Sequence, residues 1–293
     1  MDGDMEDMPI ARGGIPVGPT AQIAAADWAR DRLAEFGIRI PPGNRLQRAK
    51  TLLENVNASS AAFTVANDLL DRVTEAQWTI IELYIITRSL GSPTRSLDVR
   101  ISRKLEEMLS GSDSYVDDRN PLARNTQFEL YVAAAFTMGD VPVTLGEPDL
   151  LFDYLGTQCG LAAKRVRSIR QAPRRANEAA NQLRAAGLRG VVAVNVDVLL
   201  KGGESAPDPT MTFPERLEVV QQIEARMSER PEVVATMTFG RDCIWLLGGP
   251  RPRSEMSHSI RFTLHPRTNA EEEAGRVFFN RLMARIEERM QTL

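Results

Sequence analysis

The chain has 293 residues, of which 43% are hydrophobic and 26% are charged, and its formal net charge is -3. This length and apolar content suffice for one large or two ordinary globular domains, and the acidic balance excludes a generally basic nucleic-acid binder. The two cysteines, Cys159 and Cys243, lack CxxC spacing, which argues against a disulfide framework or a zinc site and predicts free thiols.

Residues 1–20 are rich in Gly, Pro and Asp and have no periodic apolar face, so they are predicted to form a flexible tail. The acidic start lacks the positive and apolar regions of a secretory signal. No apolar stretch is long enough to span a bilayer. We therefore expect a cytoplasmic protein without a membrane partner.

Residues 21–111 show helical periodicity and are predicted to form an all-helical region. The expected helices are Ala21–Phe36, Arg45–Val56, Ala61–Leu90 and Leu97–Leu109. The polar stretch 112–119 is the predicted domain boundary.

From Asn120 the pattern changes to short strands alternating with helices. Asn120 and Pro121 are good N-cap and N1 residues for a helix that runs to Met138. The other expected elements are strands at Pro142–Leu145, Leu150–Leu155, Gln158–Val166, Gly190–Val198, Val233–Phe239, Cys243–Leu247 and Ile260–His265, and helices at Pro173–Ala186, Pro214–Met227 and Ala270–Gln291. Residues 120–293 are thus predicted to be an α/β domain with a mixed central sheet flanked by helices.

Three separated residues are the candidate catalytic group. Asp149 opens one strand of a predicted hairpin and Lys164 stands near the end of the other, so a carboxylate and an ammonium can converge. Glu129 is a lone carboxylate on the apolar stripe of the preceding helix and needs a cation, a metal or a hydrogen-bond donor as partner.

The order of helix with Glu129, Pro148-Asp149, turn at Gly156, strand with Lys164, helix and apolar strand resembles the PD-(D/E)XK nuclease superfamily, the restriction-endonuclease-like fold, over roughly residues 120–200. The resemblance implies that Asp149 and Glu129 hold Mg²⁺ or Mn²⁺ and that Lys164 orients or activates water. Carboxylates suit such hard cations, and hydrolysis of a phosphodiester needs a polarised water. The function expected is a metal-dependent nuclease, acting on DNA rather than RNA.

The sequence departs from the family at Ala162, where the resemblance requires a second metal-binding acid. Gln158, Asp153 and Glu147 are nearby candidates for a migrated ligand. Loss of activity is the alternative, which leaves a binding module for nucleic acid or a protein. Glu129 could then form a structural ion pair with Arg124 or Lys164.

A basic segment follows Lys164 and suits contact with phosphates. The resemblance also places Gln182 at a substrate contact, although the aromatic that often accompanies it is absent. The nucleic-acid-binding candidates are Arg165, Arg167, Arg170, Arg174, Arg175 and Gln182. A solvated helix face is the plain alternative.

Other features of the sequence give weaker indications. His258 and His265 are too few for a triad or a multi-histidine metal centre, and Trp28, Trp78 and Trp245 are expected in the core. A homo-oligomer is a possible assembly. A third hypothesis makes the helical region a dimerisation or docking bundle.

Overall fold

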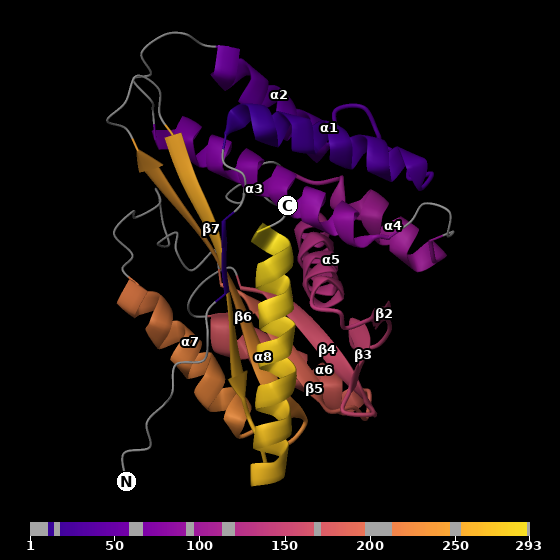
Figure 1. Ribbon diagram of the computed structural model, residues 1–293, viewed down its shortest axis with the longest axis vertical. Coiled ribbons are helices and arrows are strands. Elements are labelled where there is room, and N and C mark those ends of the chain that lie inside the picture. Colours follow the sequence, from indigo (N-terminus) through magenta and orange to yellow (C-terminus); the bar gives the residue numbers. More distant parts are fainter. Residues whose placement is uncertain are drawn as a thin grey trace. The chain divides into compact units, whose positions relative to one another are not determined.

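The structure is a computed structural model that describes residues 11–14, 18–58, 67–91, 97–112, 121–166, 171–196, 213–246 and 253–291 (Figure 1). It divides into two compact units. The helical unit comprises Gly14–Ala135 and Asp242–Ser257, and the α/β unit comprises Met1–Gly13, Phe136–Arg241 and His258–Thr292. The units change over after residues 13, 135, 241 and 257, and none of these points lies in the connector predicted at 112–119.

The helical unit contains most of the chain's first half. Its helices are α1 (Pro19–Glu35), α2 (Arg45–Ala58), α3 (Asn67–Ser89), α4 (Val99–Met108) and the first part of α5 (Leu122–Met138). Apolar side chains at helical spacing, such as Leu33, Leu53 and Ile80, are buried where α1, α2 and α3 pack together. The predicted helix 61–90 agrees with α3 from Asn67 onward, and its first residues lie outside the described ranges.

Buried polar side chains join these helices. The guanidinium of Arg45, which is 1% exposed, donates to Gln127 Oε1 at 2.7 Å and to Thr79 Oγ1 at 3.3 Å. Arg124 of α5 pairs with Glu75 of α3 at 3.1 Å. Because a buried charge is costly without a partner, these contacts fix which faces of α2, α3 and α5 meet.

The described strands form a seven-stranded sheet in the order β1-β7-β6-β5-β4-β3-β2. The strands are β1 (Ala11–Gly14), β2 (Val143–Leu145), β3 (Leu150–Tyr154), β4 (Thr157–Arg165), β5 (Gly190–Asn195), β6 (Val233–Leu246) and β7 (Arg253–Leu264). β3 is antiparallel to both β2 and β4, whereas β4, β5 and β6 are parallel. The expected mixed sheet is therefore present.

Helices cover both faces of the sheet in the α/β unit. They are α6 (Ala172–Ala185), α7 (Phe213–Ser228) and α8 (Asn269–Gln291). On one face Ala162, Val192 and Val194 pack with buried residues of α6 and α7. α8 lies on the other face (Figure 1). There Phe152 and Tyr154 of β3 contact Phe278 of α8, with ring centroids 6.4 Å and 5.0 Å away. The result is a three-layer α/β/α arrangement.

Several strands differ from the sequence prediction. β1 lies within the predicted tail, and β6 is one strand of 14 residues where two were expected. Gly240, in the middle of β6, leaves room for the Ser259 side chain of β7. A Cβ on residue 240 would lie only 2.7 Å from Ser259 Oγ. This glycine therefore serves a close approach between strands and does not end the strand. β7 also begins earlier than predicted.

The start of β5 depends on a second close approach. Gly190 is opposite Gly160 of β4, and a Cβ on Gly190 would lie 1.8 Å from the Gly160 carbonyl oxygen. No side chain fits at residue 190, so a glycine is needed for the backbones of β4 and β5 to approach each other this closely.

Candidate functional site

The structure brings Asp149 and Lys164 together in the α/β unit. Asp149 immediately precedes β3, and Lys164 is the penultimate residue of β4, so the antiparallel pairing of these strands places both at one end of the hairpin. The Lys164 ammonium donates to Asp149 Oδ2 at 3.3 Å and to the Ala163 carbonyl at 3.0 Å. The Ala163 N–H also donates to Asp149 Oδ2, at 2.8 Å.

Both side chains are mostly shielded from solvent. Their exposed fractions are 17% for Lys164 and 13% for Asp149. Charge-assisted hydrogen bonds are strong in such surroundings, so Asp149 holds the ammonium at the carboxyl end of β4. A lysine fixed in this way is suited to meet an anion as a point charge.

Ala162 occupies the position at which the resemblance requires a second acid. Its side chain shares the strand face of Lys164 and is fully buried, in a cluster that includes Ala176, Ala179 and Leu183 of α6. Methyl groups of α6 thus occupy the space next to this strand position. A carboxylate at residue 162 would have to enter an apolar layer.

Glu129 has a partner within the helical unit. Its carboxylate pairs with Lys104 of α4. Arg124, one of the partners considered from the sequence, binds Glu75 instead, and Lys164 binds Asp149. A joint role of Glu129 with the other two residues stays a prediction.

The described residues do not fit a two-acid magnesium site. Hard cations prefer several carboxylate or carbonyl oxygens, but position 162, where the resemblance requires the second acid, carries a methyl group. Within the described part of the chain, no three His, Cys, Asp or Glu side chains gather closely enough to hold a metal ion. The expectation of Mg²⁺ or Mn²⁺ therefore remains without structural support.

The predicted nucleic-acid-binding residues have mixed surroundings. Arg174 and Arg175 both pair with Glu178 on α6, at 2.9 Å and 2.7 Å. Buried atoms of two candidates, Arg175 Nε and Gln182 Oε1, have no hydrogen-bond partner. Arg165 is half-buried at the end of β4, and Arg167 and Arg170 lie outside the described residues.

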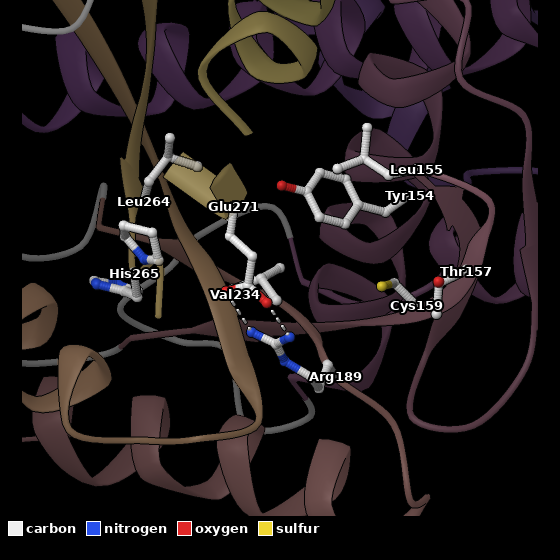
Figure 2. Close-up of a pocket in the computed structure, with 10 residues that line it drawn as sticks. Tyr154, Leu155, Thr157, Cys159, Arg189, Val234, Leu264, His265 and Glu271 are labelled. Atoms are coloured by element: carbon white, nitrogen blue, oxygen red, sulfur yellow. Dashed lines mark hydrogen bonds and ion pairs between the residues drawn. The ribbon is translucent and has the colours of Figure 1, made fainter. Parts of the chain in front are cut away.

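A separate pocket of about 170 Å³ lies at the opposite ends of β4 and β5. It is lined mainly by the β3–β4 turn, the starts of β5 and β6, and the segment that leads into α8. Figure 2 shows the Tyr154 hydroxyl and the Cys159 sulfur pointing into it, above the ion pair of Arg189 and Glu271. Arg189 Nη1 lies 2.8 Å from Glu271 Oε1.

The titratable groups of this pocket are poorly suited to catalysis at neutral pH. Burial raises the pKa of the Cys159 thiol to about 11 and lowers the pKa of His265 to about 4. Hydrogen bonds from the Arg189 side chain and the Arg267 backbone lower the pKa of Glu271 to about 2. General acid–base catalysis needs a pKa near the working pH, and a protonated thiol is a weak nucleophile.

Sequence analysis did not predict the pairing of Arg189 with Glu271. The sequence does contain a signal for the start of the helix that carries Glu271, because Thr268 and Glu271 have the spacing of a capping box. In the structure Thr268 Oγ1 accepts a hydrogen bond from the Glu271 N–H at 3.1 Å. The Arg189–Glu271 pair thus anchors the start of α8 beside β5.

Comparisons with protein-family models, with curated proteins and with solved structures give no match. Among the helices that the structure describes, none combines the length and apolarity needed to cross a membrane.

Proposed function

We propose that the α/β unit is a nuclease-like module that binds the phosphate backbone of nucleic acid and does not hydrolyse it. Lys164 is the central phosphate contact, and arginines at the end of β4 and the start of α6 extend the binding surface. DNA is the expected ligand. The observation that carries the proposal is the pairing of Lys164 with a single carboxylate, Asp149, beside the buried Ala162.

The arrangement of elements supports the nuclease-like assignment. α5, β2, β3, β4, α6 and β5 follow one another in the order that the resemblance implies, with Asp149 before β3 and Lys164 near the end of β4. Fold alone does not determine activity, so the argument for binding without cleavage depends on the site.

The charges at the site favour an anion over a divalent cation. An ammonium has three donors, and those of Lys164 that are matched by described residues go to Asp149 and Ala163, which leaves one donor for a ligand. Arg165 is next in the chain, and Arg174 and Arg175 lie in the first turns of α6. These basic residues therefore stand at the carboxyl end of β4 and at the start of α6, the elements on either side of residues 167–170. Such groups bind phosphates with a strong dependence on salt.

Metal-dependent cleavage is the second candidate. The direct contact between Asp149 and Lys164 favours it, since the PD-(D/E)XK resemblance assigns these two residues to the reaction. The missing acid at Ala162 weighs against it.

The test measures binding of a labelled DNA duplex by fluorescence anisotropy, with EDTA or with Mg²⁺. Lys164→Ala is expected to weaken binding about tenfold and to reduce the salt slope by about one, as for loss of one phosphate contact. Arg276→Ala is the control for the loss of a positive charge elsewhere in the α/β unit, because Arg276 is an exposed arginine of α8 paired with Glu272, and it should leave duplex binding unchanged.

Plasmid DNA incubated with Mg²⁺ or Mn²⁺ distinguishes the two candidates. We expect the plasmid to stay supercoiled. Nicking that disappears in both Asp149→Ala and Lys164→Ala would establish the hydrolase instead. Duplex binding that is equal in Lys164→Ala and the unchanged protein would refute the binding site.

A further inference from the structure

The helical unit carries a cluster of two aromatic rings and one arginine on α1 and α3. Trp28 and Tyr84 make an edge-to-face contact with ring centroids 5.1 Å apart. The Arg88 guanidinium lies over both rings, 5.6 Å from the Trp28 centroid and 5.7 Å from the Tyr84 centroid. We call these three residues the Trp28 cluster.

Arg88 differs from its basic neighbours in its partners. Arg30 pairs with Asp31 at 2.8 Å, and Lys50 pairs with Asp27 at 2.6 Å. Arg88, by contrast, forms no ion pair with any residue in the described ranges, and its recorded contacts are the two rings. An exposed guanidinium without a carboxylate keeps its donors available for an external anion.

The rings of the Trp28 cluster are also accessible. Trp28 and Tyr84 are only half-buried, whereas Trp78 of the same unit is 3% exposed. The sequence expectation of core packing thus holds for Trp78 and only in part for Trp28. Along α1 the pattern continues, since the Arg32 guanidinium lies 4.9 Å from the Phe36 ring centroid. Aromatic and basic side chains therefore alternate at residues 28, 32 and 36 on one side of α1.

We propose that the Trp28 cluster is a contact site for single-stranded nucleic acid, an inference that rests on the proposed function of the α/β unit. Arg88 binds a backbone phosphate, and an unpaired base stacks on the exposed parts of the cluster. Stacking on a side chain needs a base with a free face. In a duplex the bases are stacked on one another, so a single strand is the better ligand. An arginine held over aromatic rings supplies a planar surface and phosphate donors together.

The local charges permit this ligand. The carboxylates of α1 near the cluster are each paired, Asp27 with Lys50 and Arg30, Asp31 with Arg30, and Glu35 with Arg32, so Arg88 adds a positive charge that they do not cancel. An acidic peptide is the competing partner for such a surface, but it offers no planar base to match the rings.

The experiment follows tryptophan fluorescence while single-stranded (dT)12 is added at low salt. Saturable quenching is expected for the unchanged protein. Arg88→Ala should weaken the apparent affinity about tenfold, and Trp28→Phe should remove most of the quenching. Arg30→Ala is the matched control, an exposed arginine on the same pair of helices that already has a carboxylate partner, and it should bind as the unchanged protein does.

Lys164→Ala separates this inference from the proposed function. It should weaken duplex binding while (dT)12 still quenches the fluorescence, so failure at one site is distinguishable from failure at the other. Equal quenching of Arg88→Ala and the unchanged protein would overturn the Trp28 cluster as a binding site. Stronger quenching by an oligo-aspartate peptide than by (dT)12 would overturn nucleic acid as its ligand.

Discussion

His265 is a buried histidine that the fold keeps neutral. It is 8% exposed, and its ring shares a hydrogen bond of 2.7 Å with Thr236 Oγ1. Burial lowers its pKa from 6.5 to about 4. Between these values the unfolded chain binds a proton that the folded protein does not bind, so the unfolded state gains stability as the pH falls.

We therefore predict that the free energy of unfolding decreases as the pH falls from about 6.5 to about 4. His265 accounts for up to about 3 kcal/mol of this loss. Urea unfolding of the unchanged protein and of His265→Gln, measured across this range, checks the prediction. The variant should show a flatter dependence; equal slopes would contradict it. Glu271 affects stability at lower pH. Its contribution to the free energy of unfolding is lost as the pH falls from 4.5 towards about 2.

Ala162 gives a second prediction at this scale. Ala162→Glu should destabilise the protein by several kcal/mol, because it places a carboxylate among the methyl groups of α6. Ala185→Glu, at an exposed position of the same helix, should change stability by no more than about 0.5 kcal/mol. Thermal unfolding measures both. A stable Ala162→Glu protein that nicks plasmid with Mg²⁺ would mean that residue 162 faces a usable metal site.

Sequence reasoning predicted single residues well where the argument was local. The contact of Asp149 with Lys164 follows from strand alternation and from a short hairpin, both of which can be read from residues 149–164. The pairing of Glu129 with Lys104 could not be read in this way, because it depends on which face of α4 packs against α5. Burial of Ala162 likewise depends on the alanine-rich face of α6.

At the scale of elements, the junction of β4 and β5 is governed by two glycines. Gly190→Ala should destabilise the protein by about 3 kcal/mol, since its Cβ would meet a backbone oxygen that cannot move without shifting β4. Gly160→Ala should cost less, because its added Cβ would meet side-chain atoms of Leu183 at 2.8 Å and Pro148 at 2.9 Å. Urea midpoints of the two variants provide the comparison, and a larger loss for Gly160→Ala would argue against this packing.

The elements themselves were predictable to differing degrees. The helices α1 and α8, for example, lie close to their expected ranges of 21–36 and 270–291. The long strand β6 was divided in the prediction because local sequence does not reveal a partner strand that requires a glycine. β1 was missed for a similar reason, since a four-residue strand exists only through its neighbour in the sheet.

At the scale of the whole molecule, the two units are divided within secondary-structure elements and not at linkers. The changes at residues 13/14, 135/136, 241/242 and 257/258 fall within β1, α5, β6 and β7. The predicted boundary at 112–119 was inferred from polar composition, which marks a connector but carries no information on which distant segments pack together. The helical unit also includes Asp242–Ser257, which no reading of the first 111 residues could supply.

Because elements continue from one unit into the other, we predict that the two units unfold together. All three tryptophans, at residues 28, 78 and 245, belong to the helical unit, so their fluorescence reports that unit while far-UV circular dichroism reports both. The two signals should give the same urea midpoint. Separate midpoints would mean that the units are independent, and a fragment of residues 1–111 could then fold alone.

The placement of Asp242–Ser257 also bears on how the protein is made. The helices α1 to α4 leave the ribosome early, yet the last internal segment of their unit follows more than a hundred residues later. Contacts so distant along the chain form slowly, and a nascent chain exposes incomplete apolar surface until they do. Most of the polypeptide must therefore be synthesised before the helical unit can be completed.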